Sequence, residues 1–281
     1  MSEARLEARL TQGAVNRRLS ELALPMMGGI LGVYGFGLAD TYFVALLGER
    51  ELAAMSFTFP VIMVLIGVAF AMNTGTTSVV ARYICQRQSA AVRRIATDSL
   101  ALAFLTVLLF ATVGILTIDP LFKLLGAPPE ILPLIRTYML IWYPGMVFLV
   151  VPMVANASIR ATGDTRFPAL MMIGAMGFNL VLDPLLIFGL WGFPRMELEG
   201  AAWATVISRA AVFVASLLLM HYKEKLLDIS LPSLKRVLGS WKEVGVVALP
   251  ATATNLLEPL AAGVVTRLIA EQGATAVAVW G

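Results

Sequence analysis

Acidic and amide side chains lie inside long apolar stretches of this sequence, where they could take up and release a proton or a small cation. Asp40 and Asp183 each lie within such a stretch. A carboxylate at membrane depth is costly unless it is paired, hydrated or functional. Asn179 precedes Asp183 by four residues, so the two side chains share a helical face and the amide can hydrogen-bond the carboxylate.

Further polar groups lie at the same depth in other apolar stretches. At about 1.5 Å per helical residue, Asp40 and Asp183 are both ~10 to 12 Å from the outer boundary. Tyr138 and Thr205 bring a hydroxyl to that level from two other stretches. We expect these groups to form one site where paired carboxylates titrate together and couple an ion gradient to a conformational change.

Structural roles are the alternative for each of these residues. Asp183 precedes Pro184 and could satisfy backbone donors around a proline kink. Asp40 could be a buried hydrogen-bond partner, and hydroxyl groups such as those of Tyr138 and Thr205 are common in membrane helices. Two acids at one depth are harder to explain in this way than one.

A third acid, Glu258, lies near the centre of the last apolar stretch. We expect it to bind a second cation or a cationic substrate. The alternative is a helix-to-helix hydrogen bond beside Pro259. Arg209 and Arg267 also lie within apolar stretches, and the sequence assigns neither a role.

The composition predicts an all-α, polytopic membrane protein. The chain has 281 residues, of which 59% are hydrophobic and 14% charged, with a mean hydropathy of +0.83. Apolar runs near the ~20 residues of a membrane-spanning helix are long and lack the alternation of barrel strands. They cover residues 22–46, 54–80, 96–118, 132–153, 167–190, 199–221 and 244–269.

The distribution of basic residues predicts a cytoplasmic N-terminus in the cell (inner) membrane. Fifteen Lys and Arg residues lie on one side, in segments 1–21, 82–94, 160–166 and 223–242, whereas the opposite loops hold four. Cytoplasmic loops carry this excess in membrane proteins. The net charge of +3 therefore reflects topology, and we expect no nucleic-acid partner.

An internal repeat links the first and the last apolar runs. Leu24-Pro25 and Gly48 reappear as Leu249-Pro250 and Gly273, both at an offset of 225 residues. Repeats of this kind build many secondary transporters. Because each copy holds six crossings, an even number, both copies must insert in the same orientation, which is a parallel repeat.

Ordered short motifs resemble the multidrug and toxic compound extrusion (MATE) family along essentially the whole chain. They are Ala39-Asp40-Thr41, Leu47-Gly48, Leu52-Ala53-Ala54, Asn156 to Arg160, Ala161-Thr162-Gly163-Asp164-Thr165, Asn179, Asp183-Pro184, Gly200-Ala201-Ala202 and Ala204-Thr205. The resemblance implies an antiporter with two six-helix lobes that exports cationic and amphiphilic drugs in exchange for H⁺ or Na⁺. It also implies that Asp40, Asn179 and Asp183, with Tyr138, Asn156 and Thr205, form the cation site of the N-lobe.

The resemblance predicts four segments. These are a cytoplasmic tail (1–21), an N-lobe of six transmembrane helices (22–221), a cytoplasmic linker (222–243) and the first helix and following loop of a C-lobe (244–281). Two lobes need about twice the 225-residue repeat. We therefore expect the chain to be a fragment whose partner is the rest of its own C-lobe, and the complete protein to be monomeric.

Other function classes remain as alternatives to an antiporter. A lipid-linked precursor flippase of the wider superfamily is expected to line its cavity with basic side chains, whereas acids are favoured here. A membrane scaffold or channel subunit does not explain the burial of Asp40 and Asp183. We expect no enzyme, since the single His221 and single Cys85 have no nucleophile, base or metal-ligand partners at suitable spacing. No cofactor is expected beyond the coupling H⁺ or Na⁺.

Overall fold

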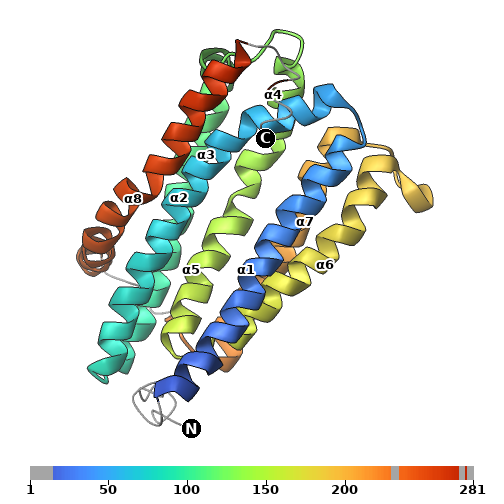
Figure 1. Cartoon of the computed structure of the whole chain (residues 1–281). Helices are drawn as coiled ribbons and strands as arrows, with labels where there is room; N and C mark the ends of the chain where they lie inside the picture. The colour runs from blue at the N-terminus through green and yellow to red at the C-terminus, as the bar shows by residue number, and fades with distance from the viewer. Residues whose placement is uncertain (1–14, 229–233, 272–275, 277–281) are drawn as a thin grey trace.

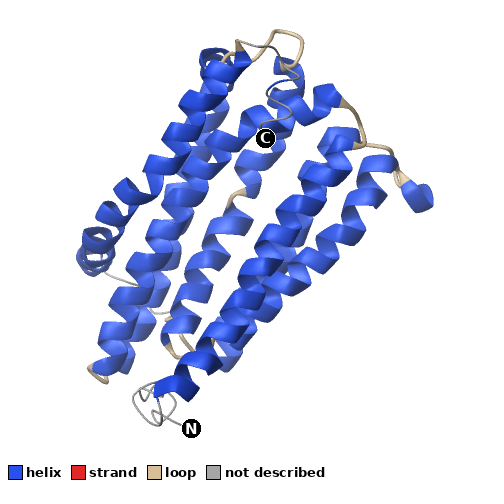
Figure 2. Cartoon of the chain, viewed as in Figure 1, coloured by secondary structure: helices blue, strands red, loops and turns tan. Residues whose placement is uncertain are grey.

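The computed structural model describes residues 15–228, 234–271 and 276. Helices account for the architecture, and no strand occurs in these ranges (Figure 2). The long helices are α1 (Val15–Ala45), α2 (Glu49–Cys85), α3 (Ser89–Leu124), α4 (Leu132–Gly145), α5 (Val147–Ala161), α6 (Arg166–Phe188), α7 (Glu197–Leu218) and α8 (Leu234–Ala270). The all-α prediction is confirmed.

The helices run up and down beside one another (Figure 1). Among the described residues, six spans are long and apolar enough to cross a membrane: α2, α3, α4 with α5, α6, α7 with the π-helix η4 (Leu219–Lys223), and α8. α1 is not among these six, yet it lies along α6 over most of its length (Figure 1). The side of the bundle at which α1 begins is called the inner side, and the opposite one is the outer side.

Most helices extend beyond the apolar runs that predicted them. α2 covers residues 49–85 where the hydropathy gave 54–80, and α8 begins at Leu234 rather than at 244. Hydropathy marks only the part of a helix within hydrocarbon, whereas the helical backbone continues into the interface. The predicted run 132–153 is two helices, α4 and α5, which meet at Gly145 and Met146 directly after Pro144.

Small residues let α1 lie close to α6. A Cβ placed on Gly29 would lie 3.4 Å from the Cα of Ala169, and one on Gly32 would lie 3.5 Å from the Cα of Ile173. Such close backbone approach is typical of membrane helix pairs, which associate through packing rather than through hydrophobic burial. This contact holds the helix of Asp40 against the helix of Asp183.

α8 lies along α2 and α3. Its Asn255 Nδ2 donates to the carbonyl of Gly67 at 3.2 Å, and its Trp241 Nε1 donates to the carbonyl of Asp98 at 2.8 Å. Near the inner end, Glu243 accepts a hydrogen bond of 2.6 Å from Arg82. α8 is therefore joined to α2 and α3 by packing and by polar contacts.

Candidate functional site

Asp183 and Asn179 form a buried pair on α6. Asn179 Nδ2 donates to Asp183 Oδ1 at 3.0 Å, and neither residue is exposed. The hydrogen bond predicted from their spacing is confirmed. The second carboxylate oxygen of Asp183, Oδ2, and the single amide oxygen of Asn179, Oδ1, are buried without a hydrogen-bond partner among the described residues.

Asp40 on α1 is 6% exposed, and its Oδ1 is also buried without a partner among those residues. Its charge interacts with that of Asp183 across the α1–α6 contact and with the hydroxyl of Tyr138 on α4. Both carboxylates and Tyr138, which is 2% exposed, therefore belong to one cluster. The two predicted acids therefore lie near enough to interact electrostatically.

Thr205 on α7 is a fourth buried polar residue at the depth predicted for the acids. Its side chain is buried, and Oγ1 has no partner in the described part of the chain. Buried polar atoms almost always have a partner, so these oxygens are candidates for contact with water or an ion. Asp40, Asn179, Asp183 and Thr205 together offer four such oxygens, which suit a proton, a hydrated proton or a small hard cation.

Arg209 also belongs to the cluster, and the sequence did not assign it. It lies one turn beyond Thr205 on α7, and its charge interacts with the carboxylate of Asp40 and the hydroxyl of Tyr138. Its Cζ lies 5.6 Å from the ring centroid of Phe36 and 5.9 Å from that of Trp142. The four-residue spacing from Thr205 was the available signal, because it puts both side chains on one helical face.

Two predicted site residues lie elsewhere. Asn156 on α5 is buried, and its Oδ1 accepts a hydrogen bond of 3.3 Å from Ser216 Oγ. Ser216 follows Thr205 by three turns of α7, so this pair lies well to the inner side of the acids. Glu258 lies on α8, but its side chain is outside the described part of the structure.

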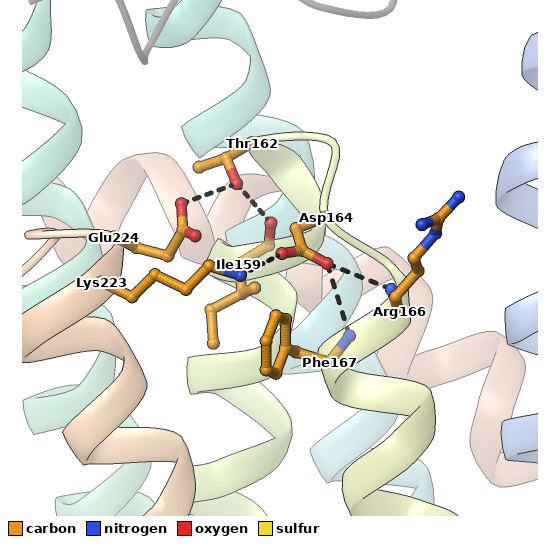
Figure 3. Close-up of polar contacts among 7 residues, drawn as sticks. All are labelled: Ile159, Thr162, Asp164, Arg166, Phe167, Lys223 and Glu224. Carbon is orange, nitrogen blue, oxygen red and sulfur yellow. Dashed lines mark hydrogen bonds and ion pairs between the residues drawn. The ribbon is translucent and has the colours of Figure 1, made fainter.

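The motif that follows Asn156 forms a polar network at the inner ends of three helices (Figure 3). Asp164 Oδ1 accepts from the backbone N–H groups of Arg166 and Phe167 at 3.1 and 3.3 Å, which caps α6. Asp164 Oδ2 accepts from Lys223 Nζ at 2.9 Å, and that ammonium lies 3.4 Å from the ring centroid of Phe167. The network ties the start of α6 to the end of α7.

The turn before Asp164 depends on glycine. Gly163 has φ +92, a conformation that side-chain-bearing residues rarely adopt. Beside it, Thr162 Oγ1 lies 2.7 Å from the carbonyl of Ile159 and 3.3 Å from Glu224 Oε2 (Figure 3). This part of the motif is structural: it joins α5, α6 and α7 at one end of the bundle.

A family model described as MatE matches residues 25–185, more than half of the chain. The chain belongs to the MATE family. The matched range includes both acids of the cluster and Asn179. This is a family of transporters, not of enzymes.

Relatives of this MATE chain carry two kinds of name. The FAD transporter of Shewanella oneidensis is 39% identical over 272 residues, which are 97% of this chain and 60% of that protein. The multidrug export protein MepA of Staphylococcus aureus is 24% identical over 268 residues, or 95% of this chain and 58% of that protein. The chain thus spans about 60% of the length of these curated relatives.

A solved MATE structure has the same fold. The Vibrio cholerae MATE transporter VcmN in the bent form is 29% identical, with a TM-score of 0.82, over 94% of this chain and 59% of that one. The MATE chain described here is therefore a multi-pass membrane protein with the fold of a transporter.

Proposed function

We propose that the protein is a secondary active exporter in which Asp40 and Asp183 exchange one coupling cation, H⁺ or Na⁺, for an amphiphilic substrate. The observation that carries this proposal is the buried cluster of both carboxylates with four unpaired oxygens among the described residues. Taking up a cation there satisfies these oxygens, and releasing it leaves two interacting carboxylates in a buried site. A site with two such states can bias a conformational change.

Alternating access would follow from movement of α1 relative to its neighbours. Of the proposed site residues, Asp40 lies on α1, whereas Asp183 lies on α6, Tyr138 on α4 and Thr205 on α7. Cation binding therefore changes the interaction between α1 and the rest of the bundle. The N-terminus lies on the cytoplasmic side in this proposal, in accordance with the excess of Lys and Arg there.

Cationic and amphiphilic compounds are the substrate class that suits a carboxylate site directly. A cationic substrate and the coupling cation compete for the same negative charge, so binding of one releases the other. This competition is the thermodynamic basis of antiport. The multidrug export relatives accord with this class.

Flavin nucleotide export is the second candidate, and the higher similarity to one relative favours it. The FAD transporter is 39% identical to this chain, compared with 24% for MepA. FAD carries an extended aromatic system with an anionic pyrophosphate. An anionic substrate does not compete with the coupling cation for the carboxylates. Exchange of FAD for a cation would therefore require coupling through the conformation of the lobes.

The experiment is efflux from energised cells of a drug-sensitive host that carries the complete reading frame. Ethidium efflux and flavin in the medium are measured for the wild type, Asp183→Asn and the control Asp119→Asn, with the proton and sodium gradients collapsed separately. Asp119 is a suitable control because it pairs with Arg136 at the outer surface, 3.0 Å away. The proposal is supported if efflux is lost in Asp183→Asn but not in Asp119→Asn, and if collapsing only one of the two gradients stops efflux by the wild type. The gradient whose collapse stops efflux identifies the coupling ion. Efflux that survives Asp183→Asn contradicts it.

A further inference from the structure

Arg209 and the two aromatic residues beside its guanidinium each lie one helical turn inward of a residue of the predicted site. Phe36 precedes Asp40 by four residues on outward-running α1, Trp142 follows Tyr138 by four on inward-running α4, and Arg209 follows Thr205 by four on inward-running α7. Four residues are about one turn, or ~6 Å. The backbone positions of Arg209, Phe36 and Trp142 therefore lie about one turn to the inner side of those of Thr205, Asp40 and Tyr138.

Among the described residues, two aromatic rings lie beside the guanidinium of Arg209, and no carboxylate lies at contact distance. Its Cζ lies 5.6 and 5.9 Å from the ring centroids of Phe36 and Trp142, which are distances of cation–π contacts. No carboxylate of the described residues lies within 4.0 Å of its nitrogens, although its charge interacts with that of Asp40. An arginine side chain stays protonated in proteins, so this is a permanent positive charge within the bundle.

Buried polar groups continue from the acids toward the inner side. Ser208 Oγ is buried without a partner in the described part of the chain, and Ser216 and Asn156 form their hydrogen bond two turns inward of Arg209. Hydroxyl and amide groups of this kind can line a path for water and cations. Along α7, Arg209 lies between Thr205, at the depth predicted for the carboxylates, and Ser216 on the inner side.

We infer that Arg209 is an electrostatic barrier that stops a cation bound at Asp40 and Asp183 from reaching the inner side through the bundle. This inference rests on the proposed function. A fixed positive charge repels a proton or Na⁺ strongly where the dielectric constant is low, and a single arginine can exclude cations from a pore in this way. The barrier makes passage of the cation depend on the conformational change, so that the gradient is not dissipated.

The test is ion leak without substrate, measured on the protein of the complete reading frame in proteoliposomes that contain a pH-sensitive or Na⁺-sensitive dye. Arg209→Met and Arg209→Gln remove the charge, and Arg209→Lys keeps it. Arg136→Met is the matched control, because it removes an arginine from an exposed outer ion pair. We expect the two neutral variants to admit the coupling ion several-fold faster than the wild type, and Arg209→Lys and Arg136→Met to remain tight.

Leak no faster than wild type in Arg209→Met and Arg209→Gln, with elution profiles that show folded protein, would overturn the barrier. If neither variant folds, Trp142→Leu is measured in the same assay, because it removes one of the rings that hold the guanidinium. Faster leak in this variant supports the barrier, and leak no faster than in the wild type overturns it. The two proposals fail separately: leak in the neutral variants without ion-coupled exchange in the wild type refutes the proposed function alone, whereas coupled exchange in the wild type without leak in the variants refutes the barrier alone.

Discussion

The Asn179 amide donates a hydrogen bond of 3.0 Å to one carboxylate oxygen of Asp183, while the other carboxylate oxygen and the amide oxygen of Asn179 have no partner among the described residues. The amide orients the carboxylate without occupying it. Asp183 Oδ2 and Asn179 Oδ1 thus remain available to a cation. This relationship sets the geometry of the proposed site.

Asn179→Ala should impair ion exchange by about tenfold or more, because a hydrogen bond to a charged group contributes about 1.5–3 kcal/mol. The measurement is substrate-driven ion flux in proteoliposomes. Asn255→Ala is the control, since that amide bonds to the carbonyl of Gly67 between α2 and α8, away from the acids. Equal flux in Asn179→Ala and wild type would show that the amide does not position Asp183.

The Asn179–Asp183 contact could be predicted from sequence because both residues lie on one helix, where spacing alone fixes neighbours. The shared depth of Asp40 and Asp183 could be predicted for the same reason, from helical rise within each run. Their lateral convergence could not, because it depends on the packing of α1 against α6.

Residues whose roles depend on contacts between helices were harder to place. Arg209 was visible as a charge in an apolar run, but its rings come from α1 and α4. Asn156 was included through the family resemblance, and the structure places it against Ser216, inward of the acids. The junction of α4 and α5 has a local signal in Pro144, which breaks the backbone hydrogen-bond ladder.

Gly75→Ala should lower the thermal stability of the purified protein. A Cβ on Gly75 would lie 2.8 Å from the carbonyl oxygen of Val244, so α8 would have to move away from α2. Overpacking of this kind costs about 1–3 kcal/mol. Gly239→Ala on α8 is the matched control, because its Cβ meets nothing within 4 Å. Melting in detergent compares the two, and equal midpoints would contradict close packing of α2 and α8.

Asp164→Ala should destabilise the inner ends of α6 and α7 more than Asp164→Asn. Alanine removes both the helix cap and the partner of Lys223, whereas asparagine keeps the acceptor for the cap. Loss of an N-cap side chain costs about 0.5–2 kcal/mol. Hydrogen exchange of the first turn of α6 reports the difference. Similar exchange in both variants would show that the cap does not hold this end.

The Arg82–Glu243 pair should contribute little and should depend on salt. The two side chains are 54% and 36% exposed, and exposed pairs are typically worth about 0.2–1 kcal/mol. A double-mutant cycle with Arg82→Gln and Glu243→Gln, measured by thermal unfolding at low and high salt, gives the coupling energy. A large, salt-independent coupling would mean that this contact locks α2 to α8 as a buried ion pair does.

Ion movement driven by substrate is the most direct test of coupling at Asp40 and Asp183. Proteoliposomes with the protein of the complete reading frame receive ethidium or FAD on one side, and the dye signals of H⁺ and Na⁺ are followed in the absence of an imposed gradient. The account predicts movement of one of the two ions against the substrate in the wild type and in Asp119→Asn, and none in Asp40→Asn or Asp183→Asn. Substrate movement with no accompanying ion, or equal ion movement in the Asp183→Asn variant, would contradict it.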